Sequence, residues 1–213
     1  KACIMGILNV TPDSFSDGGD FDTIEDALAQ VERMIAQGAS IIDVGGESTR
    51  PGAEFVTEEE EIARIVPIIQ AIKAKYDVLV SIDTYRTATA RVALEAGADI
   101  LNDVWAGLYD GQMLALAAEK DVPIILMHNQ KEEIYNDVTE DVCAFLNQRA
   151  QAALEAGVTK ENIWIDPGFG FAKNVQHNID LLKGLDKVVE LGYPVLFGIS
   201  RKRVVDYLRS EEH

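Results

Sequence analysis

The sequence predicts an α/β protein in which helices cover a parallel sheet. Short apolar runs alternate along the chain with longer amphipathic stretches, and a glycine or a short polar turn closes each amphipathic stretch. Most of the apolar runs also lack the polar alternation of a half-exposed strand. Strands that are buried on both faces and joined by helices are typical of parallel sheets.

Seven apolar runs are the expected strands. They are Cys3–Val10, Ser40–Val44, Val78–Ile82, Ile100–Val104, Pro123–Met127, Ile163–Ile165 and Val195–Ile199. Apolar residues recur at spacings of three and four in the stretches between them, which predicts helices. These are Ile24–Gln37, Glu58–Lys75, Thr87–Ala96, Gln112–Glu119, Glu140–Ala156 and Asn178–Leu191, with a further start at Arg201–Leu208.

Helix boundaries follow from capping residues. Thr23 precedes Asp26, and Thr57 precedes Glu60, at the spacing of a capping box, so each threonine is the expected N-cap of its helix. Gly97 stands where a helix should end.

Composition limits the possible partners. The 213 residues carry 19 Lys and Arg against 36 Asp and Glu, and the net charge of −17 disfavours binding to nucleic acid and to anionic membranes. An anionic substrate must therefore meet a local group of cations. Cys3 and Cys143 form no CxxC pair, and we expect both to be reduced core residues of a cytosolic protein. No apolar stretch approaches the roughly 18 residues of a membrane span.

Polar residues stand where the seven apolar runs end. They are Asn9, Asp43, Asp83, Asn102, His128, Asp166 and Ser200. Turns and helix N-caps favour Asp, Asn and Ser, which would explain any one of these residues alone. Because the carboxyl ends of parallel strands face one crevice or barrel mouth, we expect the seven to converge on one site.

Carboxylates and amides in one site favour two kinds of ligand. Their oxygen atoms bind Mg²⁺, and the same groups match the NH and carbonyl edges of a flat heterocycle. A zinc site is not expected, because His128, His177 and His213 lack the spacing of zinc ligands. By itself His128 is expected to be a hydrogen-bonded imidazole at the edge of the core.

The loop GGESTRPGA, from Gly45 to Ala53, is a candidate anion site. It sets Ser48, Thr49 and Arg50 between glycines, so that hydroxyl groups, backbone NH groups and one guanidinium are available to an anion.

Two later loops add further candidates. DPGFGFAK, which begins at Asp166, carries Phe169 and Phe171, and these rings either face an aromatic ligand or pack under the loop. GISRKR, from Gly198 to Arg203, follows the seventh apolar run with Ser200 and three cations, which suggests an anionic or carbonyl partner.

These loops and the stretch GILNVTPDSFSDGG closely resemble the dihydropteroate synthases, which are enzymes of folate biosynthesis. The motifs DVGGESTRPGA, SIDT, LNDV, LMH, DPGFGF and SRKR follow in the family's order over essentially the whole chain. The resemblance implies a (β/α)8 TIM barrel. It also implies a transferase that condenses 6-hydroxymethyl-7,8-dihydropterin diphosphate with para-aminobenzoate, with Mg²⁺ as the cofactor.

The resemblance further implies how the chain is organised in the cell. It predicts a single pterin-binding barrel domain over residues 1–213 and a cytoplasmic location. It makes sulfonamide-type compounds expected inhibitors, and it leaves a homodimer open.

The resemblance also implies a role for each matching residue. The metal ligand is Asn9, and the diphosphate is bound by Asn9, Asp43 and Thr49. The pterin pocket is formed by Asp83, Asn102, Asp166, Lys202, Phe171 and Met127. The aminobenzoate is bound by Ser200, Arg50 and Thr49. By the same resemblance, the loop after Asn9 and the loop that carries Arg50 are mobile.

One part of the family pattern is missing. The eighth strand of the family carries an Arg-x-His that clamps the diphosphate, whereas this sequence has seven apolar runs and stops at RSEEH. Open first and seventh strands would expose unpaired edges. We therefore expect the sequence to be an incomplete record of a longer chain, truncated at both ends and lacking the eighth strand and helix.

Two alternative functions remain open. A pterin-binding methyltransferase domain, which passes a methyl group from a folate to a corrinoid, shares the barrel but does not need STRPGA or SRKR. A non-catalytic pterin-binding barrel would form no product from aminobenzoate.

Overall fold

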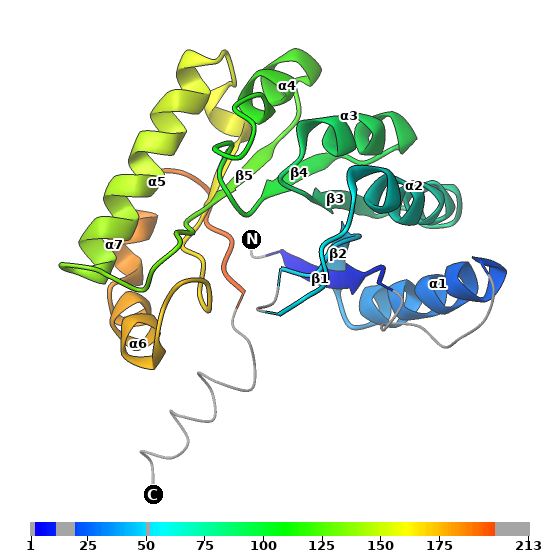
Figure 1. Cartoon of the computed structure of the whole chain (residues 1–213), viewed down its shortest axis with the longest axis horizontal. Helices are drawn as coiled ribbons and strands as arrows, with labels where there is room; N and C mark the ends of the chain where they lie inside the picture. The colour runs from blue at the N-terminus through cyan, green and yellow to red at the C-terminus, as the bar shows by residue number, and fades with distance from the viewer. Residues whose placement is uncertain (1–2, 12–19, 50–51, 199–213) are drawn as a thin grey trace, which may run out of the picture. The chain divides into compact units, whose positions relative to one another are not determined.

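The structure is a computed structural model that describes residues 3–11, 20–49 and 52–198 (Figure 1). Contacts divide the chain into two compact units, Lys1–Asn102 and Asp103–His213. A single domain over residues 1–213 remains a prediction. In the described part, no helix is both long enough and apolar enough to cross a membrane.

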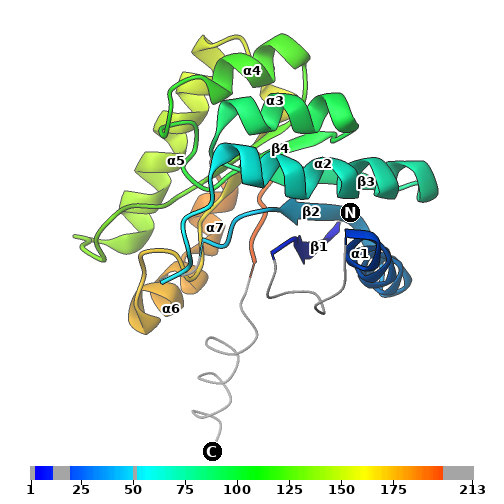
Figure 2. The same ribbon diagram turned by 45° about the vertical axis from the view of Figure 1, so that its right-hand side comes forward.

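The first unit contains parallel strands with helices between them. The strands are β1 (Ile4–Asn9), β2 (Ala39–Gly45), β3 (Leu79–Asp83) and β4 (Ile100–Asp103), which ends at the unit boundary, and each pairs in parallel with the next. The helices are α1 (Asp20–Ala36), α2 (Glu58–Lys75) and α3 (Thr87–Ala96). Helix α1 packs on β1 and β2, α2 packs on β2, and α2 also contacts α1 and α3 (Figure 2). The predicted α/β alternation is therefore confirmed in this unit.

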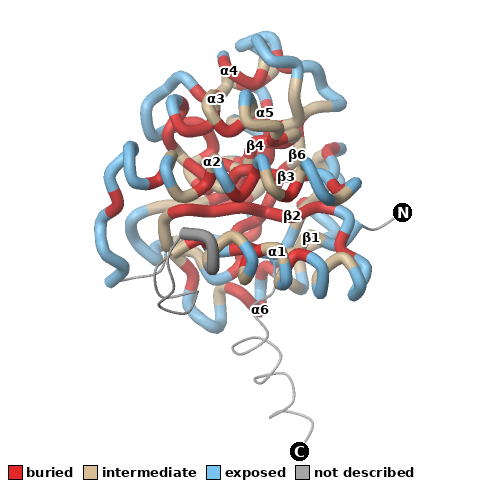
Figure 3. Tube along the Cα trace, turned by 90° about the vertical axis from the view of Figure 1, so that its right-hand side faces the viewer, coloured by how far each residue is buried: buried red, intermediate tan, exposed pale blue. Residues whose placement is uncertain are grey.

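Burial explains why the strand sequences do not alternate. All but one of the residues of β2 are buried, and the tube in Figure 3 is red along this strand. Strand β1 differs, because Ile4 and Ile7 are 56% and 62% exposed. The core of the unit lies between β2, β3 and the helices, where Ile42, Ile65, Ile69 and Ile82 are fully buried.

The capping predictions have different outcomes. The Thr57 side chain accepts a hydrogen bond from the backbone NH of Glu60 at 3.2 Å, so Thr57 is the N-cap of α2 as predicted. Thr23 is not an N-cap, because α1 begins at Asp20 and Thr23 lies inside the helix. Gly97 ends α3 with a φ of +119°, a conformation that glycine adopts without steric cost.

The second unit contains β5 (Ile124–Met127) and β6 (Ile163–Asp166), which pair in parallel. Its helices are α4 (Met113–Lys120), α5 (Val138–Glu155), α6 (Val175–Lys183) and α7 (Leu185–Val189), with a short 3-10 turn at Lys160–Asn162. The long helix α5 contacts β5, β6, α6 and α7, so it organises the packing of this unit.

The structure corrects the predicted helix Asn178–Leu191. Two helices, α6 and α7, occupy this region and meet at Gly184. A Cβ atom at Gly184 would lie 2.6 Å from Cγ2 of Thr139, so the close approach of α5 requires a glycine here. Apolar spacing alone does not reveal such a contact.

Two other expectations also change. Val195 forms a single parallel bridge to Ile165 rather than a strand, while Ile199 and the helix start at Arg201 lie outside the described residues. The cysteines are not core residues, since Cys3 is exposed and Cys143 is half-buried, although both are free thiols as predicted.

Candidate active site

One row of residues crosses the four strands of the first unit. Asn9 is paired in register with Gly45, Gly45 with Asp83, and Asp83 with Asn102. The strands end at or beside this row, so their carboxyl ends are aligned. The register thus brings Asn9, Asp83 and Asn102 to one edge, as the sequence predicted.

Gly45 makes room for the carboxylate in this row. A Cβ atom at Gly45 would lie 3.3 Å from Oδ2 of Asp83, which shows that the Asp83 side chain lies over the glycine. Asp83 and Asn102 are half-buried and Asn9 is exposed. The row therefore offers one carboxylate and two amides at different depths.

Asp43 lies two residues before the row, and this corrects its expected place at a strand end. Strand β2 continues through Val44 to Gly45, so Asp43 is paired with Ser81 inside the sheet. Its carboxylate accepts hydrogen bonds from Ser81 Oγ at 2.5 Å and from Asn102 Nδ2 at 3.2 Å. Burial raises the pKa of Asp43 from 3.8 to about 6, against the opposing effect of these two hydrogen bonds.

The side-chain amide of Asn102 donates one hydrogen bond, but its oxygen accepts none among the described residues. Its Nδ2 group binds Asp43, whereas its buried Oδ1 has no hydrogen-bond partner among the described residues. A buried acceptor without a partner costs free energy that a ligand NH group would recover. Asn102 Oδ1 is therefore a candidate ligand contact.

In the second unit, Met127 and Asp166 are paired in register at the ends of β5 and β6. Asp166 is 8% exposed, and its Oδ1 accepts a hydrogen bond from the backbone NH of Gly168 at 2.8 Å. Gly168 has a φ of +74°, and a Cβ atom there would overlap the carbonyl oxygen of His128. Glycine at this position is required for the turn that holds the Asp166 carboxylate.

Beneath this turn, Lys173 and His128 form a buried pair. Lys173 Nζ lies 2.8 Å from His128 Nδ1 and donates to the carbonyl oxygens of Gly168 and Phe171, each at 2.9 Å. Burial lowers the pKa of Lys173 to about 7, although the charge of Asp166 acts in the opposite direction. Burial and the nearby Lys173 charge lower the pKa of His128 to about 4, so the imidazole is neutral at pH 7.

His128 thus has the role expected of it, a hydrogen-bonded imidazole that is 2% exposed. The two phenylalanines of the following loop differ. Phe169 is buried against the ring of Phe197, with the ring centres 6.4 Å apart, which confirms packing under the loop. Phe171 is half-buried, and its contact with a ligand remains a prediction.

Several predicted site residues are not placed. Arg50, Ser200 and Lys202 lie outside the described residues, as do residues 12–19 of the loop after Asn9. Thr49 is described and is exposed.

Sequence reasoning missed Lys173 and Arg86. Lys173 stood at the end of the DPGFGFAK motif, and Arg86 follows the SIDT motif by two residues. Both are cations in an acidic chain next to a predicted site, which is the pattern that could have drawn attention to them. Each is 6% exposed, and neither burial nor partners can be read from its local sequence.

Comparisons with known proteins agree with this geometry. The family model described as "Pterin binding enzyme" matches residues 5–212. The chain is 75% identical over 208 residues to a dihydropteroate synthase of Streptococcus pyogenes serotype M6, and the match covers 98% of this chain and 78% of that protein.

Solved structures are similar over the same range. A Clostridium difficile dihydropteroate synthase, determined in the presence of pteroic acid, has a TM-score of 0.92 at 44% identity and covers 98% of this chain and 80% of its own. A Xanthomonas albilineans dihydropteroate synthase with 4-aminobenzoic acid has a TM-score of 0.90 at 46% identity, with 98% and 77% covered.

Proposed function

Because the chain belongs to the pterin binding enzymes, and within them to the dihydropteroate synthases, we propose that its strand-end carboxylates and amides bind a pterin diphosphate. The chain is a transferase with the fold class of its family, the (β/α)8 TIM barrel. The reaction condenses 6-hydroxymethyl-7,8-dihydropterin diphosphate with para-aminobenzoate and yields 7,8-dihydropteroate and diphosphate.

In the first unit, Asp83 and Asn102 are the proposed pterin ligands. A half-buried carboxylate accepts hydrogen bonds from ring NH and amino groups, and the unpaired Oδ1 of Asn102 accepts one more. This acceptor is the single observation in the structure that most supports a ligand at the row.

In the second unit, Asp166 is the proposed pterin carboxylate. The Gly168 NH group fixes one of its oxygen atoms, and Met127 and Phe171 supply apolar surface. Lys202, which we propose meets a ring carbonyl, lies outside the described residues.

Asn9 fits a magnesium site only in part. It is exposed at the end of β1 and offers one amide oxygen, and no cluster of three or more His, Cys, Asp or Glu in the described residues could hold a metal. Mg²⁺ is commonly bound by one or two protein ligands together with phosphate oxygens. We therefore assign Asn9 as a ligand that acts together with the diphosphate. When bound, the ion neutralises charge on that group.

The remaining assignments concern the anionic groups. Thr49 and Asp43 are assigned to the diphosphate region, and Ser200, Arg50 and Thr49 to the aminobenzoate. Asp43 is the least direct of these, because its carboxylate is buried and already accepts two hydrogen bonds. It acts on a ligand through Asn102.

The chemistry is a displacement at the methylene carbon of the pterin. The arylamine nitrogen forms a bond to this carbon, the bond between carbon and the diphosphate oxygen breaks with its electron pair, and the nitrogen loses a proton. Hydrogen bonds from the ring NH and amino groups to the carboxylates hold the ring in place for the attack.

Titration of Mg²⁺ into the protein tests the metal assignment. Binding is expected to be weak with the ion alone and to strengthen when inorganic diphosphate is present, with Asn9→Ala reducing this gain. Equally tight Mg²⁺ binding without diphosphate would contradict the assignment.

Product formation tests the function itself. The full-length enzyme is expected to release 7,8-dihydropteroate when given both substrates, which would also exclude a non-catalytic pterin-binding barrel. Methyl transfer from a folate without condensation would instead favour the methyltransferase alternative.

We also propose a cellular context. Both cysteines are free thiols, which fits a reducing compartment and hence the cytoplasm. A homodimer and inhibition by sulfonamide-type compounds are proposed from the family alone.

A further inference from the structure

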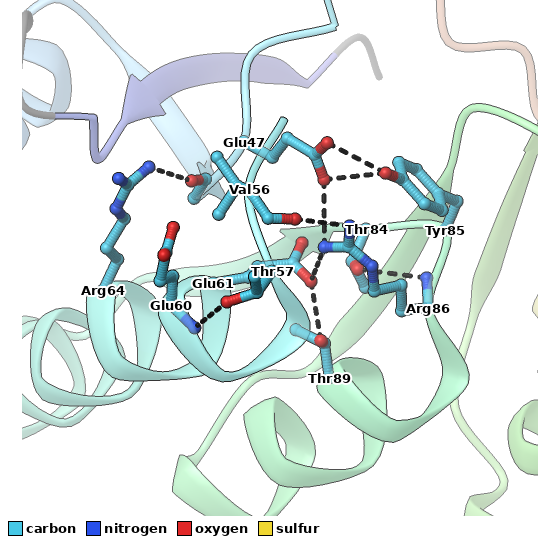
Figure 4. A network of polar contacts seen from close by, with 11 residues as sticks. Glu47, Val56, Thr57, Glu60, Glu61, Arg64, Thr84, Tyr85, Arg86 and Thr89 are labelled. Carbon is cyan, nitrogen blue, oxygen red and sulfur yellow. Dashed lines mark hydrogen bonds and ion pairs between the residues drawn. The ribbon is translucent and has the colours of Figure 1, made fainter. Parts of the chain in front are cut away.

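Arg86 contacts both ends of one surface segment (Figure 4). Its Nη1 lies 3.0 Å from Oε2 of Glu47, where the segment begins, and its Nη2 donates to the carbonyl oxygen of Val56 at 2.7 Å, where the segment ends. We call the described residues 47–49 and 52–56 the clasped segment. Thr49 belongs to this segment.

Arg86 also has a partner on helix α2. It is the N-cap residue of helix α3, and its Nη1 also lies 3.1 Å from Oε1 of Glu61 on helix α2. Thr89 Oγ1 donates to the same Glu61 oxygen at 2.6 Å. Because Glu61 is 1% exposed and Arg86 is 6% exposed, the guanidinium has a fixed, desolvated position from which to bind the segment.

Tyr85 also binds Glu47. Its hydroxyl donates to the Glu47 carboxylate, with distances of 2.9 Å and 2.8 Å to the two oxygen atoms. The guanidinium carbon of Arg86 lies 4.9 Å from the centre of the Tyr85 ring. Glu47 therefore has two partners from the stretch that directly follows Asp83.

This arrangement links two parts of the first unit. Asp83 stands at the end of β3, and the next three residues include both partners of Glu47. The contact between Arg86 and Glu61 is enough to link helix α3 to helix α2. The contacts to Glu47 and Val56 serve the segment instead.

We infer that Arg86 is a positioning residue that holds Glu47 and Val56 and so orients Thr49, two residues after Glu47, toward the arylamine substrate. The inference rests on the proposed role of Thr49 in binding aminobenzoate. Holding Glu47 in place reduces the number of conformations of the neighbouring Thr49 from which a substrate must select.

The test is the separation of two Michaelis constants in the full-length enzyme. Arg86→Lys keeps the charge but loses the planar fork, and Glu47→Gln keeps the shape but loses the charge. Each is expected to raise the KM for para-aminobenzoate about ten-fold, the effect of one lost charge-assisted hydrogen bond. The KM for the pterin diphosphate should change less than about two-fold, well below the effect of losing one hydrogen bond.

Thr89→Val is the matched control. It removes the hydrogen bond to Glu61 in the same network without touching the clasped segment, so both KM values should stay at the wild-type level. Tyr85→Phe deletes only one hydroxyl and should raise the aminobenzoate KM about three-fold, a fraction of one hydrogen bond. Because Tyr85→Phe is a small change, it tests the proposal even if Arg86→Lys does not fold.

Two outcomes would overturn the inference. One is an unchanged aminobenzoate KM in both Glu47→Gln and Tyr85→Phe. The other is an equal rise of the aminobenzoate KM in Thr89→Val. The rise would then come from general destabilisation and not from loss of contact with the clasped segment. Failure of the proposed function itself would look different, because the wild-type enzyme would then form no dihydropteroate.

Discussion

Asn102 Nδ2 donates a hydrogen bond to Oδ2 of Asp43 at 3.2 Å, and this contact leaves Asn102 Oδ1 buried without a partner among the described residues. The buried carboxyl thus orients the amide that we assign to the pterin. The same burial gives Asp43 a pKa of about 6 in place of 3.8, and this has a measurable effect on stability.

Asp43→Asn is expected to stabilise the protein relative to wild type as pH rises. Between pH 4 and 6 the folded wild-type protein binds more protons at Asp43 than the unfolded chain does, so its stability falls as pH rises through this window. The variant does not lose stability in this way. Its unfolding free energy relative to that of the wild type should therefore increase by up to about 3 kcal/mol between pH 4 and 7.

Urea unfolding of both proteins at several pH values measures this difference. Asp103, whose pKa burial raises to about 6, and His128, whose pKa is lowered to about 4, titrate in both proteins and cancel in the comparison. A difference that does not depend on pH would contradict the account of Asp43.

Gly168→Ala should be strongly destabilising. The new Cβ atom would overlap the backbone oxygen of His128 at a φ of +74°, and a backbone atom cannot move aside as a flexible side chain can. We expect a loss of more than about 3 kcal/mol in unfolding free energy.

The matched control is Gly170→Ala in the same loop. Gly170 has a φ of +83°, but nothing lies within 4 Å of its Cβ position, so only backbone strain of about 1 kcal/mol is expected. Equal losses in the two variants would show that the close approach to His128 has no energetic weight.

Lys173→Met should destabilise the loop below Asp166. Methionine has a similar length but no donors, and it leaves His128 Nδ1 and the carbonyl oxygens of Gly168 and Phe171 without their ammonium partner. Denaturant unfolding should show a loss of about 2–4 kcal/mol.

Lys187→Met is the control for this variant. Lys187 forms an exposed ion pair with Glu140 at 2.9 Å, and its removal should leave stability nearly unchanged. If Lys173→Met is as mild as Lys187→Met, the buried contacts of Lys173 are not what holds the loop.

The sequence predicted the elements well where local rules decide them. Helix α2 has the predicted bounds Glu58–Lys75, since a threonine cap and an apolar period of three to four residues are both local. The row of Asn9, Asp83 and Asn102 was likewise predictable, because parallel strands align their carboxyl ends.

Contacts between distant parts of the chain were not predictable in this way. Gly184 must be a glycine because Thr139 approaches it, and Arg86 is buried against Glu61, which lies 25 residues earlier. Asp43 was assigned to a strand end, whereas β2 extends beyond it through Val44 to Gly45. Each of these depends on packing that no local pattern contains.

Calorimetric titration of a pterin into Asp83→Asn tests the central claim most directly. Asp99→Asn is the matched control, because Asp99 binds Lys73 and the backbone NH of Val80 near the amino ends of β3 and β4, away from the row. An amide at position 83 would present an NH₂ group to a ring donor, so we predict at least about a 100-fold loss of affinity, with wild-type affinity in Asp99→Asn. Wild-type affinity in a folded Asp83→Asn protein would contradict the claim that the strand-end carboxylate binds the pterin.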